Sequence, residues 1–198
     1  MSFLKALRES WCVMVEKEMK FLVDKETFEL MLKRIEDVYP DAAKKEIIQI
    51  NYYYDTADFE LAKQNITLRV REIDNVFYLQ TKQNKQTVDG IRFAEESEKA
   101  LKNLPQNISG KDAELDTNKT YELLGKLVTK RKRFLLKNGT KIDCDINEYN
   151  GKTDYEIELE IESEVPEAFV SEFKCESCKH EGKYKRFVKE FKYEVNDL

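Results

Sequence analysis

Two carboxylates and an ammonium group occupy every second position near the start of the chain, as Glu16, Glu18 and Lys20. Side chains alternate between two faces of a β-strand, so in a strand these three share one face, with successive groups about 6–7 Å apart. The intervening face is almost purely apolar, with Val13, Val15, Met19, Phe21 and Val23. Two acids at this spacing suit a divalent cation, because hard cations prefer carboxylate oxygens.

The same alternation recurs along the chain, where each expected strand carries its charges on one face. Basic residues alternate with apolar ones at Arg69, Arg71, Lys82, Arg131 and Arg133. Acidic residues do so at Asp143, Asp145, Glu156, Glu158, Glu160 and Glu162. Each strand therefore has one apolar face and one charged face, and the sign of the charge differs between strands.

These charged faces have two interpretations. One is a structural β domain whose charged faces are exposed to water, since antiparallel sheets commonly have one wet side. The other is a sheet that closes with the charged faces inward around a hydrated tunnel. The segregation by sign favours the tunnel, and arginine suits bidentate phosphate binding. We then expect a polyanion on the basic side and a divalent metal on the acidic side, with the ligand neutralising the interior.

The elements that must position these residues are mostly strands. Strands are expected at 13–23, 47–55, 66–73, 76–82, 87–98, 127–136, 141–147 and 153–162. The turns Asn138-Gly139 and Asn150-Gly151 are typical of tight hairpins. Helices are expected from Asp24 to before Pro40, after Thr56, from Pro166 and around 184–191, and residues 99–124 are expected to form a short helix and a loop. This pattern predicts a mainly β (α+β) antiparallel domain over 14–198, preceded by an arm over 1–13.

Composition and charge limit the partners. The 198 residues include 34 basic and 39 acidic residues, for a net charge of -5, which disfavours a general nucleic-acid binder. No apolar run is long enough for a membrane span, and the start does not resemble a signal peptide. We therefore expect a cytoplasmic protein with reduced cysteines. The cluster Cys175, Cys178 and His180 lacks a nearby fourth ligand, so we expect no zinc site there. The oligomeric state stays open.

Nine short motifs, in order, resemble those of the CYTH superfamily, also called the triphosphate tunnel metalloenzymes. They are Glu16-x-Glu18-x-Lys20, Tyr54-Asp55-Thr56, Leu68-Arg69-x-Arg71, Leu79-Gln80-x-Lys82, Arg92 with Glu95 and Glu96, Arg131-x-Arg133-Phe134, Asp143-x-Asp145, Tyr155-Glu156-x-Glu158-x-Glu160 and Lys183-Tyr184-x-Arg186. Singly each motif is weak, but their order makes the resemblance specific. One departure is Glu181-Gly182-Lys183, where the family has Lys-Ser-Lys.

The resemblance implies an eight-stranded antiparallel closed β-barrel, a triphosphate tunnel with flanking helices, that requires Mg or Mn. It implies that the metal is held by Glu16, Glu18 and either Glu158 or Glu160. It implies that phosphates are bound by Lys20, Arg69, Arg71, Lys82, Arg92, Arg131, Arg133 and Lys183. Lys20, beside the metal ligands, would also take part in catalysis, and Asp145 or Glu158 would orient the attacking water.

The activity expected from the resemblance is metal-dependent hydrolysis of the terminal phosphate of inorganic tripolyphosphate or a nucleoside triphosphate. A class IV-type adenylate cyclase and a thiamine triphosphatase are alternatives within the family. A non-catalytic polyphosphate- or nucleotide-binding protein is the alternative from another class. Glu16 and Glu18 argue against it, because a pure anion binder gains nothing from carboxylates in its site.

Overall fold

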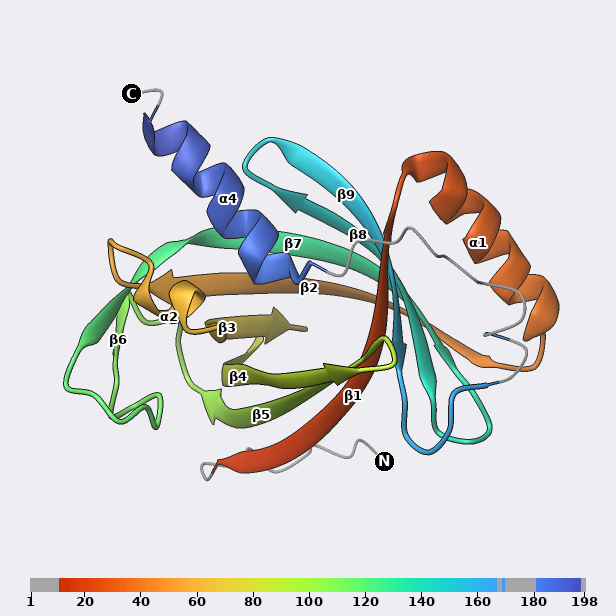
Figure 1. Cartoon of the computed structure of the whole chain (residues 1–198), viewed down its shortest axis with the longest axis horizontal. Coiled ribbons are helices and arrows are strands. Elements are labelled where there is room, and N and C mark those ends of the chain that lie inside the picture. The colour runs from red at the N-terminus through yellow and green to blue at the C-terminus, as the bar shows by residue number, and fades with distance from the viewer. Residues whose placement is uncertain (1–10, 167–168, 170–180, 197–198) are drawn as a thin grey trace.

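The computed structural model describes residues 11–166, 169 and 181–196, and most of them lie in β-strands. The strands are β1 (Cys12–Val23), β2 (Ala43–Asp55), β3 (Ile66–Ile73), β4 (Val76–Val88), β5 (Ile91–Leu101), β6 (Asn107–Ser109), β7 (Thr120–Leu135), β8 (Lys141–Tyr149) and β9 (Lys152–Glu160). Eight of them form a ring in the order β2-β3-β4-β5-β1-β9-β8-β7, which closes by pairing of β7 with β2 (Figure 1). Short β6 pairs with the start of β7 and stands outside the ring. The predicted closed eight-stranded antiparallel barrel is confirmed.

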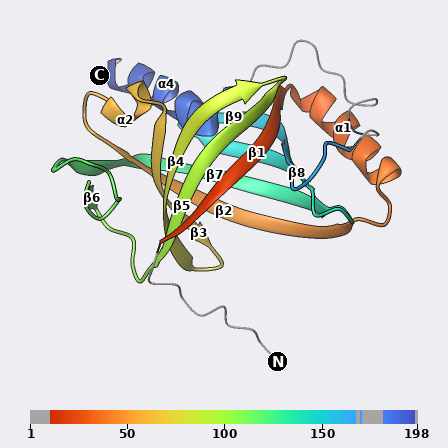
Figure 2. The same cartoon turned by 60° about the horizontal axis from the view of Figure 1, so that its bottom comes forward.

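The order around the ring decides which strands face each other across the barrel. β1 is four strands from β2 in either direction, and β9 is four strands from β3. In Figure 2, β4, β5 and β1 cross in front of β7 and β2. Strand β9, which carries Glu158, therefore lies opposite β3, which carries Arg69 and Arg71, and β1, which carries Glu16 and Glu18, is the neighbour of β9.

Helix α1 (Lys25–Val38) covers the outer face of the barrel beside β8 and β9. It begins where predicted, because the Asp24 side chain accepts a hydrogen bond of 2.7 Å from the Thr27 N–H. Its apolar side contributes Phe28 and Ile35 to a buried cluster with Ile157 and other outward-facing strand residues. This cluster is the main apolar core, and it lies outside the ring.

Helix α4 (Lys183–Asn196) packs against the inward side of the strands at one end of the barrel. The ring of Phe187 lies 5.0 Å from that of Tyr53 on β2 and 6.4 Å from that of Tyr149 on β8. Gly125 on β7 allows this approach, because a Cβ there would come within 3.1 Å of Phe187 Cζ. The predicted helix around 184–191 is thus confirmed, and it brings Lys183 and Arg186 to the interior.

The short helix α2 (Glu60–Lys63) follows β2. The N-cap residue is Phe59 and not the predicted Thr56, although the Thr56 hydroxyl group accepts a hydrogen bond of 3.1 Å from the Glu60 N–H. The Asp55 carboxylate makes more hydrogen bonds to this region. It accepts from the Leu61 and Ala62 N–H groups at 2.9 and 3.0 Å and from the Tyr184 hydroxyl group at 2.6 Å. Asp55 therefore joins β2, α2 and α4.

Two strand boundaries and one predicted helix differ from the structure. β2 begins at Ala43 instead of Ile47, because Ala43–Glu46 pairs with the basic end of β7 although it has no apolar alternation. β4 and β5 meet at the turn Asp89-Gly90, whose φ angles are +50° and +78°, so the predicted break before Thr87 was wrong. The predicted helix within 99–124 was also wrong, because this segment extends β5, forms β6 and begins β7 around tight turns.

Two predicted features fall largely outside the described residues. The helix expected from Pro166 is one of them, although Phe169 is buried in the cluster beneath α1. The other is the cluster of Cys175, Cys178 and His180. Within the part of the chain that the structure describes, no helix combines the length and apolar character that crossing a membrane requires.

Candidate functional site: a charged tunnel

The inward faces of the strands surround a cavity of about 1090 Å³. Twelve of the thirteen residues predicted for the site line it: Glu16, Glu18, Lys20, Arg69, Arg71, Lys82, Arg92, Arg131, Arg133, Glu158, Glu160 and Lys183. The thirteenth, Asp145, is fully buried and pairs with two of the lining cations, Arg131 and Lys183. The period-two pattern places these residues on the inward face, because each strand turns its apolar side to the outer core.

Glu18 is the most buried acid that lines the tunnel from β1, with a residue exposure of 2%. Its Oε2 lies 2.9 Å from Lys20 Nζ and 3.2 Å from Lys82 Nζ, and Lys82 also pairs with Glu16. Among the described residues its Oε1 has no hydrogen-bond donor, and Arg92 Nη1 lies 3.7 Å away. A buried carboxylate oxygen without a donor fits a cation ligand, so the residues present suit the expected divalent metal.

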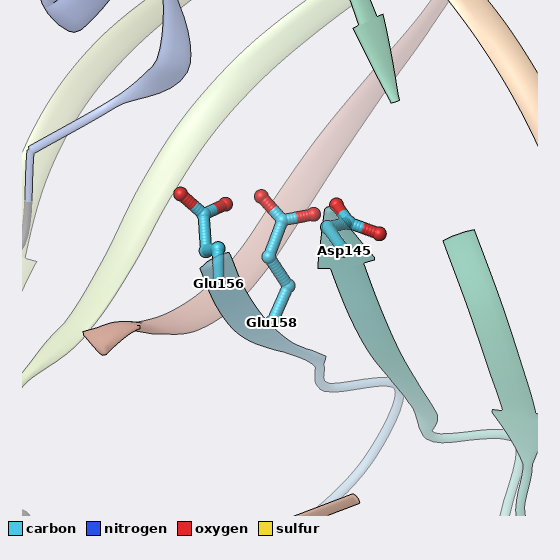
Figure 3. Close-up of side chains that lie close together, drawn as sticks. All are labelled: Asp145, Glu156 and Glu158. Atoms are coloured by element: carbon cyan, nitrogen blue, oxygen red, sulfur yellow. The ribbon is translucent and has the colours of Figure 1, made fainter. Parts of the chain in front are cut away.

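A second acidic group joins β8 and β9, where Asp145, Glu156 and Glu158 each offer an oxygen within 4.8 Å of the others (Figure 3). Lys183 Nζ lies between these carboxylates, at 2.9 Å from Asp145, 2.5 Å from Glu156 and 2.9 Å from Glu158. An ammonium group from α4 thus neutralises part of this cluster. Glu156 was not among the predicted site residues, although its place on the same face as Glu158 could have identified it.

The four predicted metal ligands are not equally close together. Lys20 pairs with both Glu18 and Glu158, so these two carboxylates lie on either side of one ammonium group. Glu16 joins them through Lys82. The backbone of Glu160 is opposite Glu18, yet its carboxylate lies 3.0 Å from Lys141 and 3.6 Å from Arg133. Glu158 is therefore the better placed of the two alternatives from the closing strand.

The arginines of β7 are held by aspartates of β8. Arg131 donates to both oxygens of Asp145 at 2.7 and 2.6 Å and to Glu158 at 2.6 Å. Arg133 donates to both oxygens of Asp143 at 2.7 and 2.6 Å. Burial lowers the pKa of Arg131, but the neighbouring carboxylates raise it by more, so the net shift is well upward.

The expected separation into a basic and an acidic side that only a ligand neutralises was too simple. Arg131 lies opposite Asp145 and Arg133 opposite Asp143 in the register of β7 and β8, so adjacent strands pair opposite charges. Most tunnel cations consequently have a carboxylate partner within the protein.

Arg71 on β3 differs from the other arginines. No carboxylate of the described residues lies within 4.0 Å of its guanidinium group, and its Nε donates to Asn51 Oδ1 at 3.1 Å. Burial, together with repulsion from Arg69, lowers its pKa to about 10, so it stays charged at neutral pH. A partly buried cation that lines the tunnel without a close carboxylate is a ready position for an anion.

The Glu96 carboxylate gives the tunnel a predicted pH dependence. Burial raises the pKa of Glu96, but Arg69, Lys82 and Arg71 lower it by more, and Arg69 Nη2 lies 3.2 Å from it. A lowered folded-state pKa adds stability above the unfolded value of about 4.3, and this stability is lost as the pH falls through the folded value. We expect the urea midpoint of wild type to exceed that of Glu96→Gln at neutral pH, and the difference to disappear as the pH falls from roughly 5 to roughly 3. A constant difference over this range would contradict the assignment, and Glu95→Gln, on a half-exposed neighbour paired with Lys85, is the control.

A closed antiparallel tunnel whose interior pairs carboxylates with lysines and arginines is a fold and site of the triphosphate-tunnel class. A family model described as CYTH domain matches residues 14–178. The chain belongs to the CYTH domain family, and the resemblance of its motifs is confirmed.

Solved structures with the same fold include several proteins of similar size. A candidate adenylate cyclase from Bacillus halodurans is 26% identical with a TM-score of 0.68, covering 88% of this chain and 98% of its own. A candidate adenylyl cyclase from Hippeastrum, described as having a dominant triphosphatase activity, is 22% identical with a TM-score of 0.65, covering 88% and 95%. The PH1819 protein from Pyrococcus horikoshii is 19% identical with a TM-score of 0.60, covering 88% and 98%. No curated protein matches the chain.

Proposed function

We propose that this protein is a metal-dependent triphosphatase that removes the terminal phosphate of inorganic tripolyphosphate or a nucleoside triphosphate inside its tunnel. The observation that carries the proposal is the combination of a tunnel-lining arginine with no carboxylate within 4.0 Å and a buried carboxylate oxygen with no hydrogen-bond donor among the described residues. Arg71 on β3 lacks an anion, and Glu18 Oε1 on β1 lacks a donor. A polyphosphate would supply the anion for Arg71, and a divalent cation would bind the Glu18 oxygen.

The cations of the tunnel bind and orient the phosphates. Lys82 and Lys20 extend from β4 and β1 beside Glu18, while Arg69 and Arg71 extend from β3. Charge on the transferring phosphoryl group is spread over its outer oxygens, so fixed ammonium and guanidinium groups stabilise the transition state. Arg92, Arg131, Arg133 and Lys183 complete the phosphate-binding set.

The carboxylates divide between two roles. Glu16, Glu18 and Glu158 would hold the divalent metal, Mg or Mn, which supplies charge neutralisation and activates water for hydrolysis when bound. Glu158 lines the cavity, and we also assign it to orienting the attacking water. Asp145 is fully buried beneath Arg131 and Lys183, so we assign it to holding these cations in position.

An adenylate cyclase is the second candidate, because the Bacillus halodurans structure with 26% identity has that assignment. The two activities leave different products from ATP. Hydrolysis of the terminal phosphate gives ADP and orthophosphate, whereas cyclisation gives a cyclic nucleotide and pyrophosphate.

The test is product analysis after incubation with ATP, tripolyphosphate or thiamine triphosphate, each with Mg, Mn or EDTA. We expect orthophosphate, metal dependence and faster turnover of tripolyphosphate or ATP than of thiamine triphosphate. Pyrophosphate with a cyclic nucleotide would establish the cyclase instead. Thermal stabilisation by triphosphate without turnover of any substrate would establish a binding protein.

A further inference from the structure

The inward-facing Tyr53 of β2 has a buried hydroxyl group that nothing in the described structure satisfies. The side chain is fully buried, and its Oη has no hydrogen-bond partner. Its neighbour Tyr54 faces the outer core and donates to the Pro105 carbonyl at 2.6 Å. Buried hydroxyl groups nearly always have a partner, so the unpaired Tyr53 needs an explanation.

The position of Tyr53 is fixed by aromatic packing at the tunnel end that α4 closes. Its ring centroid lies 4.9 Å from that of Tyr184 and 5.0 Å from that of Phe187, both on α4. Tyr53 nevertheless lines the tunnel cavity. The Tyr53 side chain is therefore packed against α4 beside the cavity.

The electrostatic surroundings of Tyr53 are those of a hydrogen-bond donor to an anion. Burial raises the pKa of the phenol overall, although Arg69, Lys183 and Arg71 act to lower it. The hydroxyl group thus keeps its proton at neutral pH. The charges that act on it are cations, and these attract the same anion to which a phenol can donate.

One further donor on the same wall of the barrel, the Asn51 side-chain amide, also lacks an acceptor among the described residues. Arg71 donates to Asn51 Oδ1, and this contact fixes the orientation of the Asn51 amide. The Asn51 Nδ2 group is then left without an acceptor among the described residues, and Asn51 is fully buried. The β2–β3 wall therefore presents a surplus of donors opposite the acidic strands β1 and β9.

We propose that Tyr53 is a substrate-binding residue whose hydroxyl group donates to an outer phosphate oxygen of the triphosphate that Arg71 also binds. The inference rests on the proposed function and deepens it. It adds a neutral donor to the charged residues of the tunnel. It also couples substrate binding to α4, because α4 holds the Tyr53 ring.

The test compares Tyr53→Phe with Tyr54→Phe, a matched pair on one strand with opposite orientations. Tripolyphosphate binding is measured by calorimetry in EDTA, which keeps it independent of turnover, and stability is measured by urea unfolding. We expect Tyr53→Phe to bind about tenfold more weakly or worse, the loss typical of a hydrogen bond to a charged group. Its urea midpoint should be unchanged or higher, since no folded-state hydrogen bond is lost.

Tyr54→Phe should show the reverse, a lower urea midpoint with unchanged affinity. If wild type binds tripolyphosphate and Tyr53→Phe binds it equally well, this inference is overturned and the proposed function still stands. A wild-type protein that fails to bind tripolyphosphate would overturn the proposed function itself. A lower midpoint for Tyr53→Phe would show that the hydroxyl group is satisfied within the protein, which also contradicts the inference.

Discussion

Replacing Glu18 with glutamine is expected to lower kcat for metal-dependent triphosphate hydrolysis by at least about a hundredfold. Loss of groups that only support metal ligands costs about 10–100-fold, so loss of a ligand itself should cost more. The isosteric amide keeps the shape of the side chain but removes the charge that faces Lys20 and Lys82. Metal-free binding of tripolyphosphate should persist or tighten, because a carboxylate that repels the phosphates is gone.

The Glu18→Gln measurement combines kcat in Mg or Mn with the Kd for tripolyphosphate in EDTA. Glu95→Gln is the matched control, because it removes a half-exposed carboxylate paired with Lys85. Both quantities should match wild type in this control. If Glu18→Gln lost metal-free binding as strongly as turnover, the assignment of Glu18 to the metal side of the tunnel would be wrong.

Replacing Arg71 with glutamine is expected to weaken tripolyphosphate binding by roughly tenfold to a hundredfold while making the unliganded protein more stable. The loss corresponds to one or two charge-assisted hydrogen bonds. The gain in stability follows because Glu96 and Glu16 only partly offset the desolvation of this guanidinium group and its repulsion from Arg69, and the net shift of its pKa is downward. Opposite changes in affinity and stability are typical of a residue kept for its ligand.

Arg133→Gln is the internal comparison for Arg71→Gln. Arg133 donates to both oxygens of Asp143, so its removal takes two hydrogen bonds from a buried carboxylate and leaves Arg131 as its remaining cationic partner. We expect Arg133→Gln to lower the urea midpoint and to weaken tripolyphosphate binding less than Arg71→Gln does. Calorimetry in EDTA and urea unfolding measure the two effects. A lower midpoint and unchanged affinity for Arg71→Gln would contradict the role assigned to Arg71.

Alternation along the strands made the lining of the tunnel predictable from the sequence, whereas the closed eight-stranded barrel was implied by the resemblance of the motifs. A period of two separates the faces of each strand, so Glu16, Glu18 and Lys20 had to lie together. The predicted strand boundaries were wrong where pairing with another strand, and not apolar alternation, defines the strand. This is the case at Ala43–Glu46 and in the segment before Leu127. Their partners in β7 and β2 are distant in sequence, and no local pattern indicates them.

The pairing of charges inside the tunnel was not predictable from single strands. Arg131 meets Asp145 through the register of β7 with β8, and register between strands depends on the whole sheet. The unsatisfied donors of Asn51 and Tyr53 were missed for a related reason. Their place on the inward face of β2 follows from alternation, but the absence of a partner appears only in three dimensions.

Orthophosphate release from tripolyphosphate by the wild-type protein, in Mg, in Mn and in EDTA, tests the central claim most directly. The tunnel predicts release with at least one of the two metals and none in EDTA, while calorimetry in EDTA still detects tripolyphosphate binding. Absence of release with both metals, or equal release in EDTA, would contradict a metal-dependent triphosphatase in this tunnel.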